Sequence, residues 1–280
     1  IDSYKQAVIA EPEYADAYHN MGVALQNKGD LEAAIVSYKQ ALIIKPDYSE
    51  AYHNMGVVLQ DKGELEAAIS SYKQAIKINP DFAEAYNNMG FALNDKGDLK
   101  GAIDCCREAI LLVPDYAHAY YNLGNALKDK GDLEVAIDSY KQAVIAEPDY
   151  AAAYNNMGNA LHDKGDVDAA IDSFKQALKI QPDYAEAYNN MGAALQDKGD
   201  VEAAIDSFKK ALKIQPDYAE AHNNMGFSLK DKGDLESAIY SFKQALKIKP
   251  IYAEAHSNLS FPHLLQGSLK TGFNFYEWRL

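Results

Sequence analysis

Residues 183–216 read DYAEAYNNMGAALQDKGDVEAAIDSFKKALKIQP, and a closely similar stretch recurs every 34 residues along the chain. The prolines mark this period, because eight of the 9 stand 34 residues apart, from Pro12 to Pro250. Two series of glycines, one through Gly192 and one through Gly199, keep the same step and include fifteen of the 17 glycines. A fixed step of this length is typical of a repeat array in which each repeat packs only on its neighbours.

Each period predicts two helices. Asp183 and Glu186 stand three residues apart and form an acidic variant of the capping box, which predicts that the first helix begins there. Gly199 predicts the end of this helix, because glycine readily adopts the left-handed conformation that follows a helix. Asp200 is the expected cap of the second helix, and Pro216 is expected to end it.

The residues at fixed positions of the period resemble the tetratricopeptide repeat. In the repeat that begins at Ala185, the positions that carry the resemblance are Tyr188, Met191-Gly192, Ala204, Phe208, Ala211 and Pro216. Gly192 and Ala204 are expected where the two helices cross, and Phe208 is expected to fill the space between adjacent repeats. The resemblance implies an all-α fold, a right-handed superhelical α-solenoid of antiparallel helix pairs.

The resemblance covers the whole chain and implies its division into repeats. A partial repeat, formed by a second helix, comes first (1–14), and an irregular, apolar eighth repeat comes last (253–280). Seven full repeats are expected between them: 15–48, 49–82, 83–116, 117–150, 151–184, 185–218 and 219–252.

A few positions depart from the pattern. Cys106 stands where other repeats have Tyr or Phe, so a looser core is expected there, and His222 and His256 replace the first aromatic. Because Cys105 and Cys106 are adjacent, we expect no disulfide between them. One of the two is expected to be half-buried and both to be reduced, which favours a cytoplasmic location.

One position of the first helix is Asn in all eight repeats. We call this row the asparagine ladder: Asn20, Asn54, Asn88, Asn122, Asn156, Asn190, Asn224 and Asn258. An amide is both donor and acceptor, so a regular row can pair with the backbone of an extended peptide whatever its side chains. The row is similar to the asparagine ladder inside the repeat superhelix of O-linked N-acetylglucosamine transferase, where it holds substrate backbone. The alternative is that each Asn pairs with the neighbouring helix and fixes the stacking of repeats, and the two roles can coexist.

The positions beside the ladder are expected to line the same groove. Those that precede the ladder are His19, His53, Asn87, Tyr121, Asn155, Asn189 and Asn223, and three residues after it stand Phe91, Asn125, Asn159 and Phe227. Glu50 and Glu186 stand where a carboxylate clamp of this family has Lys or Arg, so a carboxylate ligand is disfavoured. Acidic residues at the rim favour neutral or basic segments over acidic ones, although they could equally serve only to cap helix starts.

Composition excludes several classes of function. The chain has 27 Lys and Arg against 41 Asp and Glu, and its net charge of −14 argues against nucleic acid as a partner. No apolar run approaches the roughly 18 residues that a membrane helix needs. The 7 His show no metal-binding spacing, and no nucleophile or acid–base pair stands out. We therefore expect no metal, no cofactor and no catalytic residue in this segment.

The end of the sequence breaks the pattern. Residues 272–279 resemble a Gly-aromatic to Tyr-Glu-Trp-Arg segment that closes repeat arrays in some bacterial proteins, in which a glycosyltransferase-like domain often follows. We expect that the chain is cut at Ile1 and continues beyond Leu280. Three functions remain open: a scaffold that binds an extended peptide, the substrate-recognition arm of a larger enzyme, and an oligomer that self-associates end to end through residues 261–280.

Overall fold

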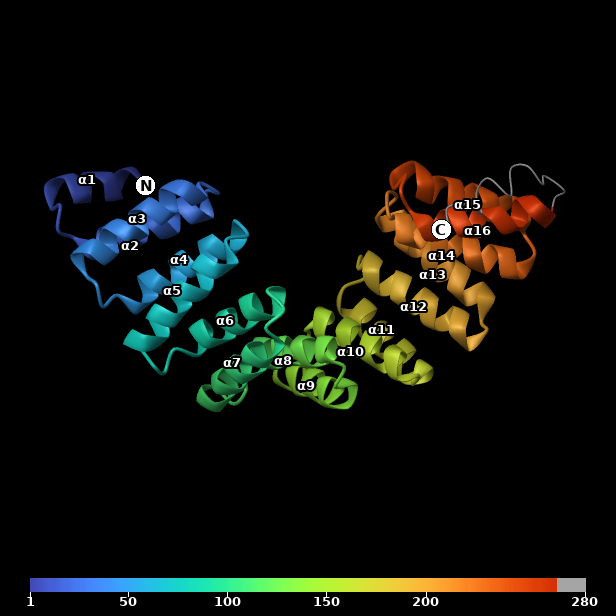
Figure 1. Cartoon of the computed structure of the whole chain (residues 1–280), viewed down its shortest axis with the longest axis horizontal. Coiled ribbons are helices and arrows are strands. Elements are labelled where there is room, and N and C mark those ends of the chain that lie inside the picture. The colour runs from blue at the N-terminus through green and yellow to red at the C-terminus, as the bar shows by residue number, and fades with distance from the viewer. Residues whose placement is uncertain (266–280) are drawn as a thin grey trace. The chain divides into compact units, whose positions relative to one another are not determined.

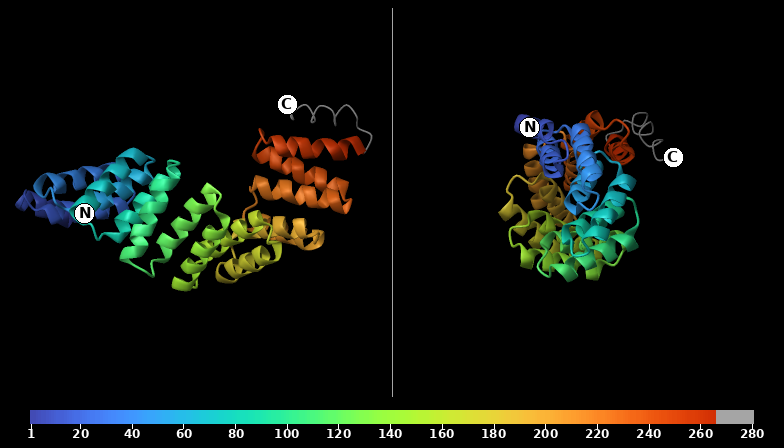
Figure 2. Two further views of the ribbon diagram at one scale, coloured as in Figure 1. Left: turned by 60° about the horizontal axis from the view of Figure 1, so that its bottom comes forward. Right: turned by 90° about the vertical axis from the view of Figure 1, so that its left-hand side faces the viewer.

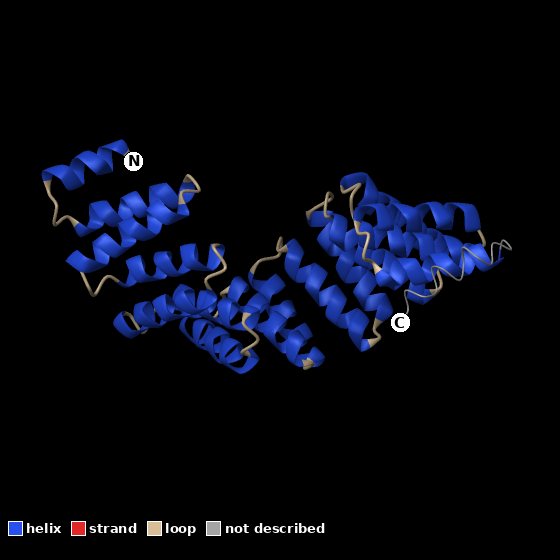
Figure 3. Cartoon of the chain, turned by 45° about the horizontal axis from the view of Figure 1, so that its top comes forward, coloured by secondary structure: helices blue, strands red, loops and turns tan. Residues whose placement is uncertain are grey.

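The computed structural model describes the backbone of residues 1–265 and the side chains of residues 1–260. Helices make up most of this part, and no residue within it lies in a strand (Figures 1 and 3). The predicted all-α fold built from helix pairs is therefore confirmed. The segment expected to self-associate, 261–280, and the aromatic segment 272–279 lie outside the described side chains.

The chain divides into two compact parts, which we call the N-terminal body (1–147) and the C-terminal body (148–280). The N-terminal body contains α1 (Asp2–Ala10), α2 (Ala15–Asn27), α3 (Leu31–Ile44), α4 (Ser49–Asp61), α5 (Leu65–Ile78), α6 (Ala83–Asp95), α7 (Leu99–Leu112), α8 (Ala117–Lys130) and α9 (Leu133–Ala146). The C-terminal body contains α10 (Ala151–Lys164), α11 (Val167–Ile180), α12 (Ala185–Lys198), α13 (Val201–Ile214), α14 (Ala219–Lys232), α15 (Leu235–Ile248) and α16 (Ala253–Leu265).

Within each body, every helix packs against the next one in the chain. Short turns join the partners, so neighbouring helices run antiparallel, and the left-hand view of Figure 2 shows the helices of the C-terminal body stacked in chain order. Each even-numbered helix also contacts the next even-numbered helix of its body. The even-numbered helices of a body therefore form one layer, which carries the asparagine ladder.

The ends of the helices follow from single residues. Gly199 ends α12 in the left-handed conformation, with φ of 87°, as predicted. Asp200 caps α13 as predicted, because its carboxylate accepts a hydrogen bond from the backbone N–H of Ala203 at 3.3 Å. The capping box predicted for α12 is wrong: the residue directly before the helix is Tyr184, which makes no side-chain cap, so Asp183 stands one residue too early to cap it.

Close contact between paired helices requires the glycines inside the helices. A Cβ atom added at Gly158 in α10 would lie 2.5 Å from Cε1 of Phe174 in α11. Phe174 is fully buried, as are Tyr38, Tyr72 and Tyr140 at the same position of other repeats. The missing Gly side chain therefore creates the space that the aromatic ring fills.

Cys106 occupies this aromatic position in the third helix pair, and both cysteines of the chain are free and buried. The prediction that one of them is half-buried is wrong, because Cys105 is 8% exposed and Cys106 is 0% exposed. In neighbouring repeats the tyrosine hydroxyl donates a hydrogen bond to a side chain of the preceding helix, such as Tyr72 to Gln60 Oε1 at 2.9 Å. Asn94 stands at the position of Gln60, and its buried Oδ1 has no donor.

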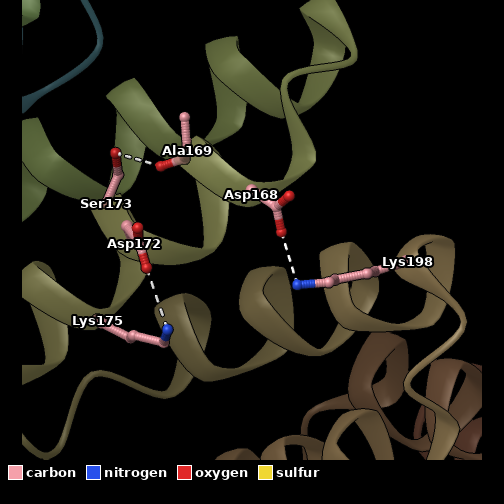
Figure 4. A network of polar contacts seen from close by, with 6 residues as sticks. All are labelled: Asp168, Ala169, Asp172, Ser173, Lys175 and Lys198. Carbon is pink, nitrogen blue, oxygen red and sulfur yellow. Dashed lines mark hydrogen bonds and ion pairs between the residues drawn. The ribbon is translucent and has the colours of Figure 1, made fainter.

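Ion pairs link the end of the first helix of a pair to the second helix of the preceding pair. Figure 4 shows Lys198 of α12 paired with Asp168 of α11 at 2.6 Å, and Lys175 paired with Asp172 within α11 at 3.0 Å. The same figure shows the Ser173 hydroxyl donating a hydrogen bond to the carbonyl of Ala169, one turn earlier. The charged groups are exposed, so each pair contributes little stability, and the packing of the helices sets their arrangement.

Candidate functional site

The asparagine ladder lies on the even-numbered helices, and it is partly accessible. Asn20 is exposed, and the other seven ladder residues are half-buried. We call the surface that these side chains reach the ladder face. Where the residue before the ladder Asn is itself Asn, it lies deeper: Asn87, Asn155, Asn189 and Asn223 are at most 7% exposed. Those four side chains were expected beside the groove, and the structure buries them between helices.

In the C-terminal body the ladder and the buried row form one chain of hydrogen bonds. Three ladder amides donate from Nδ2 to the buried Asn of the preceding repeat, and that Asn donates to the ladder amide of its own repeat. The bonds between repeats are Asn258 to Asn223 at 3.1 Å, Asn224 to Asn189 at 3.1 Å and Asn190 to Asn155 at 3.2 Å. The bonds within repeats are Asn223 to Asn224 at 3.4 Å, Asn189 to Asn190 at 3.4 Å and Asn155 to Asn156 at 3.2 Å.

All six of these bonds point the same way along the chain, so each amide polarises the next. Two buried amides also donate to carboxylates on the following even-numbered helix, Asn155 to Glu186 at 3.3 Å and Asn223 to Glu254 at 3.1 Å. The network therefore ties four consecutive repeats together, which is the stacking role left open by the sequence.

In the N-terminal body, histidines take the place of two buried asparagines. The Nδ2 of Asn88 lies 3.0 Å from Nε2 of His53, and the Nδ1 of His53 lies 3.1 Å from Oδ1 of Asn54. An amide nitrogen can only donate and an amide oxygen can only accept. His53 is therefore neutral and carries its proton on Nδ1. The same relation joins Asn54 to His19 at 3.0 Å.

Burial is the main cause that lowers the pKa of His53 and that of His19 below the ordinary value, and the bond of each ring to its ladder Asn opposes this effect. Both rings also pack on aromatic side chains, His53 on Phe82 with ring centroids 4.8 Å apart and His19 on Tyr48 at 4.9 Å. Neutral imidazoles thus continue the ladder network in the first repeats.

The network uses only part of the hydrogen-bonding capacity of four ladder amides. A side-chain amide has two N–H groups and two acceptor positions on its oxygen. Asn54, Asn88, Asn190 and Asn224 each use one N–H and one acceptor position, and the bond that Asn88 accepts comes from Asn87 at 3.1 Å. One donor and one acceptor position therefore remain on each, attached to a side chain whose orientation is fixed by the other two bonds.

A pocket of about 200 Å³ opens on the ladder face of the C-terminal body. Three consecutive even-numbered helices and α13 contribute its lining: Ala193, Gln196, Asp197, Phe208, Asn224, Phe227 and Glu254. Two expected site residues, Asn224 and Phe227, are thus brought together there. The sequence predicts Phe208 as a core residue and does not predict Gln196 or Glu254 as site residues. A signal for Glu254 was present, because it keeps the 34-residue step of Glu186 and Glu220.

The remaining expected groove residues have varied surroundings. Phe91 is 42% exposed and Phe227 is 37% exposed, so both present aromatic surface. Asn125 accepts a hydrogen bond from the hydroxyl of Tyr140 at 2.7 Å, and Tyr121 lies against the same ring. Asn159 is half-buried. Among the side chains that stand three residues after a ladder Asn, the two Phe are therefore the most accessible.

The described residues give little support to a reactive thiol, a metal site or a membrane-spanning helix. Burial raises the pKa of Cys106 to about 12 and that of Cys105 to about 11, so both thiols stay protonated at neutral pH. Within residues 1–260, no three His, Cys, Asp or Glu side chains come together as a metal site requires. No helix in the described part of the chain is long and apolar enough to cross a membrane.

Models of the tetratricopeptide repeat match nearly the whole chain, at residues 3–36, 27–63, 58–95, 81–144, 124–165, 158–199, 194–233 and 228–267. The chain therefore belongs to the tetratricopeptide repeat family and is a protein-interaction scaffold of that family. None of these models describes a catalytic domain.

Solved structures agree with this assignment. MamA is 32% identical, with a TM-score of 0.55 over 62% of this chain and 96% of its own. YrrB, a TPR protein with an unusual peptide-binding site, is 24% identical, with a TM-score of 0.54 over 66% of this chain and 95% of its own. A chain of the APC/C heterotetramer Cut9–Hcn1 is 18% identical, with a TM-score of 0.72 over 92% of this chain and 51% of its own. No curated protein sequence matches significantly.

Proposed function

We propose that the chain binds an extended peptide segment of a partner protein along the ladder face. The observation that carries the proposal is the oriented amide: the network holds Asn54, Asn88, Asn190 and Asn224 in place and leaves each of them one donor and one acceptor position. A polar group held in position binds with a smaller loss of conformational entropy than a mobile one. The ladder thus combines the stacking role with ligand binding.

The geometry of an extended peptide suits this row. Packed helices lie about 8–10 Å apart, and a peptide in the extended conformation advances about 3.3 Å per residue. One ladder amide therefore meets the peptide backbone about every third residue. Backbone pairing of this kind gives affinity without strict sequence preference, and the pockets between ladder residues supply the preference.

The test compares two double variants that break the same hydrogen bonds from opposite sides. Asn190→Ala with Asn224→Ala removes two ladder amides. Asn155→Ala with Asn189→Ala removes their buried partners, and so breaks the same two bonds between repeats. The probe is a peptide selected from a random 12-residue library displayed on phage, and its affinity for the folded chain is measured by fluorescence anisotropy.

We expect the ladder variant to lose about tenfold or more in affinity, because two hydrogen bonds to the peptide are lost. The buried variant should lose as much stability or more, yet lose less affinity than the ladder variant while folded, because Asn190 and Asn224 lose their fixed orientation but keep their donors and acceptors. Equal affinities for the two variants would contradict the ligand role and leave only the stacking role. Failure of the library to yield any binder to the ladder face would contradict the proposal as a whole.

Two other functions can be separated from this one by experiment. As the recognition arm of a larger enzyme, the ladder face would bind the substrate of a catalytic domain, and a full-length gene product with such a domain would favour that function. Self-association through residues 261–280 is tested by the dependence of mass on concentration. We also propose a reducing, cytoplasmic compartment, which the two free, buried cysteines support.

A further inference from the structure

We infer that the pocket in the C-terminal body takes one Lys or Arg side chain of the bound peptide. This inference rests on the proposed function and adds a specificity to it. The pocket holds about 200 Å³, less than the roughly 300–1,000 Å³ of a small-molecule site. Its size therefore suits one side chain of a peptide whose backbone lies on the ladder.

The walls of the pocket match a long side chain with an apolar stem. Ala193 of α12 and Phe227 of α14 supply apolar surface, and the buried Phe208 of α13 also lines the pocket. The ladder residue Asn224 lines the same pocket, so the peptide backbone bound there stands directly beside the opening. The methylene groups of Lys or Arg can pack on the aromatic surface while the charged end reaches a polar group.

Two carboxylates lie at the pocket for that charged end. Glu254 accepts a hydrogen bond from Asn223 at 3.1 Å, which orients it, and Asp197 pairs with His162 at 2.8 Å. Both carboxylates are otherwise exposed to solvent. A third acid, Asp231, lies close by and accepts from Gln196 at 2.8 Å.

One cation already stands at the rim. The ammonium of Lys230 lies 3.8 Å from the centre of the Phe227 ring and 3.5 Å from Asp231. Asp231 balances its charge, so Asp197 and Glu254 leave the pocket with an excess of negative charge. Lys230 follows Phe227 by three residues on α14, so this contact is a local one along the helix, of the kind that cations and aromatic rings favour.

The corresponding position in the N-terminal body supplies the control. A shift of 136 residues, four repeats, carries Phe227 to Phe91, Phe208 to Tyr72 and Glu254 to His118. The Tyr72 hydroxyl binds Gln60 there, and the carboxylate is replaced by an imidazole. Phe91 is exposed to a similar extent as Phe227. Asp197 keeps a counterpart in Asp61, so the two bodies share the aromatic residue and one acid and differ in Glu254. The cation preference that Glu254 supplies therefore belongs to the C-terminal body.

The experiment selects random 12-residue peptides displayed on phage with the wild-type chain and with Glu254→Gln. Glutamine keeps an oxygen that can accept from Asn223, so the variant removes charge rather than structure. We expect one peptide position to be enriched in Lys and Arg with the wild type and to lose that enrichment with the variant. A selected peptide and its analogue with Met in place of the cation are then measured by anisotropy.

With the wild type, the exchange of the cation for Met should lower affinity about tenfold, and with Glu254→Gln by about threefold or less. Phe227→Ala should weaken the cationic peptide while Phe91→Ala leaves this preference unchanged. Peptides that bind with no cationic position, or an equal effect of Met on both proteins, would overturn the inference and leave the proposed function standing. Absence of any binder overturns both.

Discussion

The same substitution, Gly to Ala, should have opposite effects at two helical positions of this chain. In a helix, Ala is favoured over Gly by about 0.5–1 kcal/mol. At Gly158 the added Cβ would lie 2.5, 2.8 and 2.9 Å from three ring carbons of Phe174. Phe174 is 0% exposed, so the ring cannot move into solvent, and overpacking of this kind costs about 1–3 kcal/mol. We expect Gly158→Ala to lower the free energy of unfolding by about 1–2 kcal/mol.

Gly101 in α7 is the matched control. Its added Cβ would meet the Asp98 carboxylate at 2.6 Å, but that group is the end of an exposed side chain and can rotate. Asp30 and Asp200 cap their helices in the same way although the third helical residue is Ala, as Ala33 and Ala203. We expect Gly101→Ala to raise the free energy of unfolding by about 0.5–1 kcal/mol.

The assay is urea denaturation followed by circular dichroism, together with amide hydrogen exchange, because long repeat arrays need not unfold in one step. With a slope of about 1–3 kcal/mol per molar urea, each kcal/mol moves the midpoint by about 0.3–1 M. The exchange rates should rise in α10 and α11 for Gly158→Ala and fall in α7 for Gly101→Ala. A third variant, Gly158→Ala with Phe174→Leu, should lose less than the sum of the two single variants. If both glycine variants shift the midpoint in the same direction, or if the losses in this cycle are additive, the close-contact argument is refuted.

Two other predictions concern the N-terminal body. Cys106→Tyr should raise the free energy of unfolding by about 1–2 kcal/mol, because the ring restores apolar burial and its hydroxyl can donate to Asn94 Oδ1; a lower urea midpoint would mean that neighbouring side chains already fill the space. His53 and His19 have lowered pKa values in the folded chain, so the unfolded chain binds more protons as the pH falls through about 6.5. Stability should therefore be highest above this pH and should decrease below it. Replacement of both histidines by Asn, the residue found at this position in other repeats, should reduce that decrease relative to the wild type, and identical pH profiles would contradict it.

The period of the sequence predicts the fold well because the residues that mark it stand at positions where few other residue types can fold. Gly199 has φ of 87°, a conformation that side chains other than glycine rarely adopt, and Gly158 admits no Cβ beside Phe174. Such positions tolerate almost no other residue, so the repeat shows clearly. The sequence predicts the start of α12 one residue too early, because Asp and Glu near a helix start fit several registers. An acidic residue directly before the helix caps it, whereas one a residue further away only places a charge near the helix end.

The candidate site was harder to predict, and the reason lies in neighbouring residues. Asn189 and Asn190 are adjacent and chemically identical, yet Asn189 is 7% exposed and pairs with the ladder of the next repeat, while Asn190 is half-buried on the ladder face. Consecutive helical residues point about 100° apart, so one step along the sequence exchanges a position on the ladder face for a buried one. The periodicity located the row, but only the donors and acceptors in the structure separate the two. The substitution of His for Asn at position 53 follows the same logic: an imidazole with one donor and one acceptor replaces a buried amide in the hydrogen-bond chain, and no residue lacking either group could keep that chain continuous.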